Sequence, residues 1–251
     1  MPALAVIPAR YASTRFPGKP LADSTGKPLI RHVVERVRLA RHIGRIIVAT
    51  DDNRILSAVR EFGCEAVMTG EHPNGTSRIA EVVRNLQKQV GPDDIIVNVQ
   101  GDEPEIEPRV IDELIDGLML DPDAPMATLA SEFHPDEDAG NPNIVKLVTA
   151  RADGRMRALY FSRALIPFDR DQRRFAPPLK HPGLYAYRKD FLLHYVTLPA
   201  TPCEEMEQLE QLRALEHGYA IAVIKTQVAH HGIDTPQQYE AFVKRCAKAQ
   251  G

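Results

Sequence analysis

The chain has 251 residues, of which 43% are hydrophobic and 26% are charged, and its formal net charge at pH 7 is -3. This composition is typical of a globular protein, and the length suits one large core, so we expect a single domain over residues 1–251. A slightly acidic chain gives no reason to expect a nucleic-acid or membrane partner. No apolar run reaches the roughly 18 residues of a membrane span, and the start lacks the features of a signal peptide.

Cysteine usage indicates the compartment. The three cysteines, Cys64, Cys203 and Cys246, are odd in number and widely spaced. This pattern argues against a disulfide framework and against a zinc site, both of which need regular groups of cysteines. The sequence therefore predicts a protein of the reducing cytoplasm.

The first half of the chain alternates short β-rich runs with helical patterns. Strands are expected at residues 4–7, 45–50, 65–69 and 94–100, and helices at residues 28–41, 52–62, 76–89 and 108–119. Strand-helix alternation with apolar runs too short to be helices is typical of a parallel sheet with helices on both faces. The sequence thus predicts an α/β, Rossmann-like fold, whose binding crevice lies beyond the carboxyl ends of the strands. The loops that start at Pro8, Thr50, Gly70 and Gly101 should meet there.

The pattern changes near residue 126. The runs "MATLA", "NIVKLV", "ALYFS" and "GLYAYR", with an "ADGR" turn between two of them, predict antiparallel strands and a small arm in an otherwise mostly parallel, mixed sheet. A helix over residues 203–217 and a strand over residues 220–225 should follow. The last helix should begin at Thr235, because Thr235 can cap it, Pro236 suits its first position, and Gln238 stands three residues after the cap.

The opening loop concentrates positive charge. The segment "VIPARYASTRFPGKP", residues 6–20, holds Arg10, Arg15 and Lys19 and no acidic residue. Its glycine and hydroxyl spacing fits neither a Walker phosphate loop nor a dinucleotide fingerprint. Arginine can grip phosphate oxygens with two parallel hydrogen bonds, and lysine can follow charge as it moves to a leaving group. From the residues alone, an anion site and a solvated basic loop both remain open.

Several motifs occur together along almost the whole chain. They are "IPARYASTRFPGKPL", "NVQGDEP", "GNPNIVK", "ALYFSRALIPFDRD", "HPGLYAYR", "LEQLRALEHG" and "GIDTP". In this order they closely resemble the 3-deoxy-manno-octulosonate cytidylyltransferases, which belong to the nucleotide-diphospho-sugar transferase fold. The resemblance implies transfer of CMP from CTP to 3-deoxy-D-manno-octulosonate (Kdo), giving CMP-Kdo and pyrophosphate for lipopolysaccharide assembly. It also implies a nucleotide-binding half (residues 1–125), a sugar-binding and dimerisation half (residues 126–251), and a homodimer.

The resemblance gives the opening loop a role in binding CTP. Displacement of pyrophosphate from the α-phosphorus builds negative charge on the leaving group. Arg15 and Lys19 are therefore expected to clamp the β- and γ-phosphates, with Arg10 near the α-phosphate and Ser13 in the same loop. No covalent nucleophile is needed, because the anomeric hydroxyl of the sugar attacks directly.

Two aspartates match the metal positions of the family, which implies Mg²⁺ as the cofactor. Mg²⁺ typically takes one or two protein carboxylates and fills its other positions with substrate oxygens and water. Asp102 follows the strand at residues 94–100, and Asp234 precedes the last helix. Asp102 could instead only begin a turn, and Glu103 is a rival ligand. Asp234 could be a helix cap, although Thr235 fills that role better.

A glycine turn before the third helix resembles the loop that reads the cytosine edge. Asn74, Gly75 and Arg78 are the expected contacts. The family usually has Ser-Gly-Thr followed by an acid and Arg, whereas this chain has Asn74 at the start and Ser77 in place of the acid. Asn74 can still donate and accept hydrogen bonds, whereas Ser77 removes a carboxylate from this loop.

The sugar site should need polar groups for several hydroxyls and one carboxylate. In the predicted helix at residues 203–217, Met206, Leu209 and Leu212 are expected to face a core, with polar residues on the adjacent flank. A solvated charged face is the usual explanation for such a flank. The resemblance favours as sugar contacts Gln100, Arg163, His181, Tyr185, Glu210 and Gln211.

Two other functions remain. One is a cytidylyltransferase for a related acid, such as 8-amino-Kdo or a sialic acid. The other is a non-catalytic protein that binds CTP, which would be expected to have lost phosphate or metal ligands. The sequence retains Arg10, Arg15, Lys19, Asp102 and Asp234.

Overall fold

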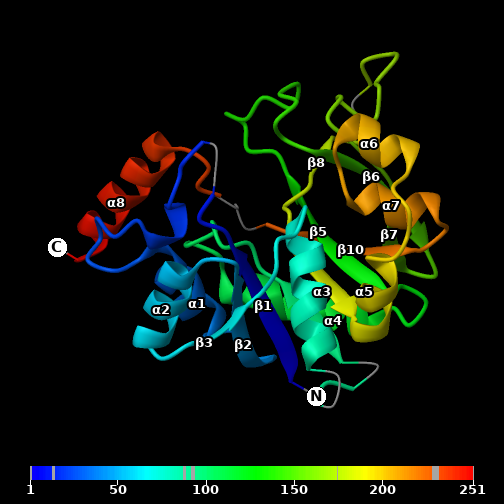
Figure 1. Cartoon of the computed structure of the whole chain (residues 1–251). Helices are drawn as coiled ribbons and strands as arrows, with labels where there is room; N and C mark the ends of the chain where they lie inside the picture. The colour runs from blue at the N-terminus through cyan, green and yellow to red at the C-terminus, as the bar shows by residue number, and fades with distance from the viewer. Residues whose placement is uncertain are drawn as a thin grey trace. The chain divides into compact units, whose positions relative to one another are not determined.

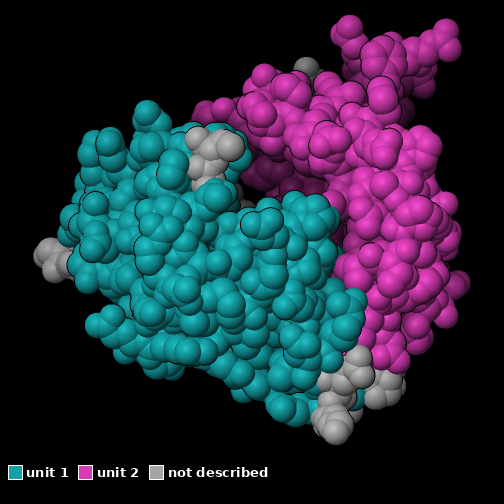
Figure 2. Space-filling view, viewed as in Figure 1, with its two compact units in different colours: residues 1–112, 230–251 teal, residues 113–229 magenta. Residues whose placement is uncertain are grey.

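The computed structural model describes residues 2–12, 15–86, 89–91, 94–173, 175–227 and 232–250 (Figure 1). The chain forms two compact units, coloured separately in Figure 2: unit 1 comprises residues 1–112 and 230–251, and unit 2 comprises residues 113–229. No helix in the described part of the chain is both long and apolar enough to cross a membrane.

The sheet of unit 1 is parallel, as predicted. Its strands are β1 (Ala3–Ala9), β2 (Ile43–Thr50), β3 (Glu65–Met68) and β4 (Ile95–Asn98). β1 lies between β4 and β2, and β3 pairs with the other edge of β2. Ala9 pairs with Thr50, and Thr50 pairs with Met68. The carboxyl ends of these three strands are therefore level, and the loops that follow them start at one edge.

The helices of unit 1 bury apolar stripes and start at polar caps. They are α1 (Leu29–Val37), α2 (Asn53–Glu61) and α3 (Gly75–Asn85), and α4 (Pro108–Leu120) runs across the boundary between the units. Asp52 caps α2 and Asn74 caps α3, each accepting a hydrogen bond from a backbone N–H at 2.9 Å. All four predicted helices are confirmed, with ends a few residues from the expected ones.

The last helix, α8 (Pro236–Gln250), belongs to unit 1. The start signal is confirmed, because the Thr235 hydroxyl accepts a hydrogen bond from the Gln238 backbone N–H at 3.3 Å. Tyr239 and Phe242 on its apolar face form a buried cluster with Leu29 of α1 and Ile233. Phe16 of the opening loop packs against this cluster. Apolar packing therefore brings the chain just before α8 to the opening loop.

Unit 2 contains the predicted antiparallel strands. They are β5 (Met126–Glu132), β6 (Lys146–Ala152), β7 (Arg155–Ser162), β8 (Leu179–Lys180), β9 (Tyr185–Arg188) and β10 (Ile221–Thr226). β5 pairs antiparallel with β8 and β9 and parallel with β10, and β6 and β7 form a hairpin. The predicted turn is confirmed: Asp153 and Gly154 both have positive φ, 52° and 78°, as a tight hairpin turn requires.

The helices of unit 2 correct one prediction. They are α5 (Lys189–Tyr195), α6 (Pro202–Glu207) and α7 (Gln211–Glu216), so the single helix expected over residues 203–217 is wrong. The break is at Gln208, whose backbone is left-handed, with φ 53° and ψ 49°. Arg163 donates hydrogen bonds to the backbone carbonyls of Glu207 and Gln208. These two carbonyls therefore accept from a side chain at the point where the helix ends. Met206, expected in the core, is 85% exposed.

Candidate active site

The opening loop fixes the position of Lys19. The loop leaves β1 at Arg10 and turns at Gly18, where φ is 72°, a conformation that favours glycine. The Gly18 N–H donates to the Tyr11 carbonyl at 2.9 Å, and a single 3-10 turn runs over Lys19–Leu21. A side chain at Gly18 would lie 3.2 Å from the Tyr11 ring, so the turn also packs closely. Lys19 thus projects from an ordered part of the loop.

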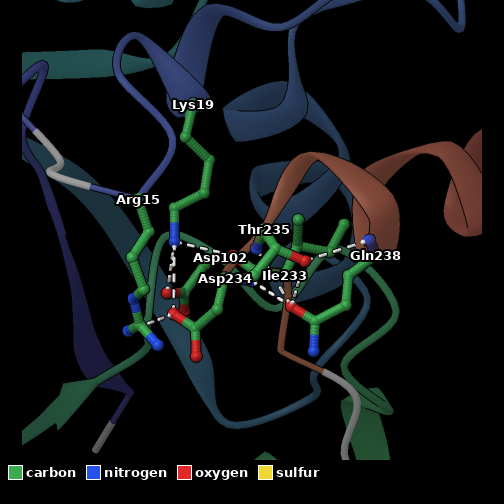
Figure 3. A network of polar contacts seen from close by, with 7 residues as sticks. All are labelled: Arg15, Lys19, Asp102, Ile233, Asp234, Thr235 and Gln238. Atoms are coloured by element: carbon green, nitrogen blue, oxygen red, sulfur yellow. Dashed lines mark hydrogen bonds and ion pairs between the residues drawn. The ribbon is translucent and has the colours of Figure 1, made fainter.

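Figure 3 shows that the Lys19 ammonium group lies among oxygens from two distant segments. Its Nζ donates to Asp102 Oδ2 at 2.7 Å and to the Ile233 carbonyl at 2.7 Å. It also lies 3.9 Å from Asp234 Oδ1. The Lys19 side chain is only 13% exposed, so these interactions are weakly screened by solvent. The solvated-loop interpretation does not describe Lys19.

Arg15 and Arg10 are held more loosely. Arg15 donates to Asp234 Oδ1 at 2.9 Å, but both side chains are well exposed, at 65% and 45%. An exposed ion pair of this kind contributes little to stability, about 0–1 kcal/mol, so Arg15 can turn toward an anion at small cost. Arg10 donates to the Pro73 carbonyl at 3.4 Å, on the loop before α3. Ser13, the fourth residue expected to bind phosphate, lies outside the described residues.

The two aspartates are close together in space, and several contacts hold them there. Asp102 follows β4, and its backbone carbonyl accepts a hydrogen bond from the Ile233 N–H at 2.8 Å. Asp234 directly follows Ile233 in the chain. The backbone N–H of Asp234 donates a hydrogen bond to Gln238 Oε1 at 2.7 Å. The Asp234 carboxylate is therefore not the cap of α8. Together with the buried cluster beneath α8, these bonds place both carboxylates around Lys19.

The donor set fits a hard divalent cation. Carboxylate oxygens are the preferred protein ligands of such ions, and two carboxylates leave positions for substrate oxygens and water. No group of three or more His, Cys, Asp or Glu side chains in the described ranges is arranged to hold a metal ion. Any metal bound at Asp102 and Asp234 would therefore depend on the substrate for further ligands. The rival residue Glu103 is only 8% exposed.

The three residues predicted to read the base, Asn74, Gly75 and Arg78, make contacts within the protein that the sequence did not indicate. Asn74 Oδ1 is used to cap the helix. A side chain at Gly75 would lie 3.2 Å from the Pro8 ring, so glycine allows close approach to the end of β1. Arg78 is completely buried and donates hydrogen bonds to Asp51 and Thr69. Asp51 was not predicted as a site residue, although its place directly after β2 puts it at the expected edge.

Four of the predicted sugar contacts, His181, Tyr185, Glu210 and Gln211, come from two short stretches of unit 2. His181 and Tyr185 have ring centroids 5.5 Å apart. Burial, the Tyr195 hydroxyl and the Glu210 carboxylate raise the pKa of Tyr185 well above its usual value. Gln211 is 4% exposed, and its Nε2 has no hydrogen-bond partner among the described residues. Buried amide groups are normally paired, so a ligand bound beside Gln211 would supply the partner that this donor lacks.

The other two predicted sugar contacts are placed differently. Arg163 donates to the carbonyls of Glu207 at 2.7 Å, Pro142 at 3.1 Å and Gln208 at 3.3 Å. These bonds use its guanidinium to hold the break between α6 and α7. Gln100 belongs to unit 1, where its amide donates to Asn98 Oδ1 at 3.3 Å.

His181 has a defined tautomer. The Thr128 hydroxyl has a single hydrogen and donates it to the Leu184 carbonyl at 2.8 Å, so it accepts from His181 Nε2 at 2.9 Å. His181 Nδ1 is then the bare nitrogen and can accept a hydrogen bond. Burial lowers the pKa of His181 to about 3, because the charged ring would lose solvation.

We expect His181 to remain neutral across the working pH range of the protein. The lowered pKa places its protonation far below the usual value near 6.5. In a histidine-labelled NMR titration, the His181 resonances should not move between pH 5 and 8. A His181 midpoint above pH 6 would contradict the buried, neutral ring.

Comparison with known proteins decides the family. Residues 4–224 match the protein family described as Cytidylyltransferase. A 3-deoxy-manno-octulosonate cytidylyltransferase from Syntrophobacter fumaroxidans is 52% identical over 240 residues, covering 95% of this chain and 94% of that protein. This chain belongs to the 3-deoxy-manno-octulosonate cytidylyltransferase family. It is therefore a nucleotidyltransferase.

Solved structures agree with this family and with the predicted fold class. The structure of a CMP:2-keto-3-deoxy-manno-octonic acid synthetase complexed with CTP superposes with a TM-score of 0.90 at 43% identity, covering 99% of this chain and all of that one. A 4-diphosphocytidyl-2C-methyl-D-erythritol synthase, at 13% identity and a TM-score of 0.64, shares the fold alone. The predicted α/β nucleotidyltransferase fold is confirmed.

Proposed function

We propose that this protein transfers CMP from CTP to the anomeric hydroxyl of Kdo, releasing pyrophosphate, and so supplies CMP-Kdo for lipopolysaccharide assembly. The observation that carries the proposal is the meeting of Lys19, Arg15, Asp102 and Asp234 at the carboxyl edge of a parallel sheet. This edge is where nucleotides bind in such folds. The names of the relatives supply the identity of both substrates.

The phosphate groups are assigned to the basic side chains of unit 1. Arg15 and Lys19 hold the β- and γ-phosphates and stabilise the charge that develops on the leaving pyrophosphate. Arg10 lies nearer the α-phosphate, at the end of β1. Ser13 is assigned to the same loop. The exposed pair of Arg15 with Asp234 can open at small cost when CTP enters.

We assign Mg²⁺ as the cofactor, held by Asp102 and Asp234. When bound, such an ion can polarise the α-phosphate and help to orient the attacking hydroxyl. Asp102 is presented by the end of β4, and Asp234 is presented by the start of α8. In this assignment Lys19 turns from the two carboxylates toward the triphosphate.

We place the sugar with the polar cluster of unit 2. His181 Nδ1 can accept a hydrogen bond from a hydroxyl, while Gln211 Nε2 can donate to one. Tyr185 and Glu210 add a phenol and a carboxylate to the same cluster. Gln100 of unit 1 is retained as a further contact. Arg163 holds backbone carbonyls in the described structure, so its proposed role is to shape the cluster.

The wider arrangement is also proposed. The two units would act as one catalytic domain over residues 1–251, and two chains would form a homodimer through the half after residue 126. We place the protein in the cytoplasm, because all three cysteines are free thiols. Small-molecule substrates, without nucleic-acid or membrane partners, are consistent with the net charge of -3.

The test is pyrophosphate release from CTP and Mg²⁺ with a panel of 2-keto sugar acids. We expect turnover with Kdo and little or none with sialic acid, and omission of Mg²⁺ should abolish it. Turnover of 8-amino-Kdo or sialic acid in place of Kdo would overturn the substrate assignment. CTP binding without turnover of any acid would indicate a non-catalytic protein.

A further inference from the structure

A buried ion pair lies at the edge of the sheet where the nucleotide is proposed to bind. Arg78 of α3 has no solvent exposure, and it donates hydrogen bonds to the Asp51 carboxylate and the Thr69 hydroxyl. Its Nε has no hydrogen-bond partner among the described residues. A fully buried guanidinium needs a nearby counter-charge, and the Asp51 carboxylate supplies it here.

Unlike Arg78, Asp51 is accessible to solvent. Its side chain is 30% exposed, and only Oδ2 is engaged by Arg78. Oδ1 receives no hydrogen bond from any residue that the structure describes. A carboxylate held on one side by a buried arginine has a fixed orientation, and its second oxygen remains a strong acceptor.

The strand register places Asp51 beside the opening loop. Thr50 pairs with Ala9, so Asp51 and Arg10 leave neighbouring strands at the same level. Arg10 reaches the Pro73 carbonyl, and Gly75 approaches the Pro8 ring. Asp51 and the turn before α3 therefore both lie near the end of β1.

We propose that Asp51 selects the base of the nucleotide, with Asp51 Oδ1 accepting a hydrogen bond from the 4-amino group of cytosine. Uracil has a carbonyl oxygen at that position, which a carboxylate would repel. Arg78 is the positioning residue for Asp51. This inference rests on the proposed function, since it assumes that the nucleotide is CTP.

The experiment compares binding of CTP and UTP to the full-length protein by calorimetry, with Mg²⁺ and without sugar. We expect the unchanged protein to prefer CTP by at least tenfold. Asp51→Asn should reduce the preference at least tenfold, because an amide can also donate a hydrogen bond to the carbonyl of uracil. Asp52→Asn is the matched control: its carboxylate caps α2 and pairs with Arg54, so it should leave the preference unchanged.

Removing the charge of Asp51 also leaves Arg78 without its counter-ion, so melting temperatures accompany each binding measurement. If Asp51→Asn does not fold, the double variant Asp51→Asn with Arg78→Met removes both charges and takes its place. A lower melting temperature with an unchanged preference would overturn the proposal and leave Asp51 a counter-ion only. If the unchanged protein releases no pyrophosphate with any acid, the proposed function fails, and the preference for CTP can still be measured independently.

Discussion

Lys19→Ala is expected to lower turnover at least tenfold while the protein stays folded. The ammonium group lies at the centre of the proposed site, 2.7 Å from Asp102 Oδ2. It should stabilise the leaving pyrophosphate more than the bound triphosphate, so its loss raises the barrier to the chemical step. A tenfold loss corresponds to about 1.4 kcal/mol. Steady-state kinetics with CTP and Kdo measures it.

Lys27→Ala is the matched control for this variant. Lys27 lies close in sequence but pairs with Glu35 on α1, away from the two aspartates. It should keep normal turnover and normal CTP binding. Unchanged turnover in the Lys19 variant would show that Lys19 is only a structural partner of Asp102.

The substitutions Asp102→Asn and Asp234→Asn should each weaken Mg²⁺-dependent turnover strongly. The amide keeps the size of the side chain but loses the charge that a hard divalent cation requires. If both carboxylates hold one ion, the second substitution should have much less effect once the first carboxylate is gone, as expected for residues that act as a unit. A double-mutant cycle on kcat/KM at saturating Mg²⁺ tests this coupling.

Two controls make that cycle interpretable. Asp23→Asn removes an exposed carboxylate from unit 1 and should leave kcat/KM unchanged. Melting curves should show that the Asn variants are folded, since both carboxylates also contact basic side chains. Strictly additive losses, or normal metal dependence in the Asp234 variant, would remove Asp234 from the metal site. Glu103 would then be the next residue to test.

Local patterns were sufficient to predict most of unit 1. Strand-helix alternation and the rule that loops meet at the carboxyl edge located the sheet and its binding edge. The cap, proline and glutamine before α8 marked its start correctly. The closeness of Asp102 and Asp234 could come only from the family resemblance, because it depends on α8 returning to pack against Leu29 and Phe16. No local pattern encodes that return.

The wrong helix prediction in unit 2 also results from contacts between residues far apart in the sequence. Helical spacing predicted one helix over residues 203–217, but contacts from Arg163 to the carbonyls of Glu207 and Gln208 interrupt it. The interruption turns Met206 outward and buries Gln211. The proposed role of Asp51 could not be predicted, because it depends on Arg78 being buried, which a sequence alone does not reveal.

The central claim is that Asp102 and Asp234 hold one divalent cation next to the triphosphate. The most direct measurement is a crystal structure with CTP and Mn²⁺, in which anomalous scattering locates the ion. The account predicts a peak about 2.0–2.3 Å from a carboxylate oxygen of each aspartate, with the Lys19 ammonium turned toward the phosphates. A peak that contacts only phosphate oxygens, or one held by Glu103 while Lys19 remains between the two aspartates, would contradict it.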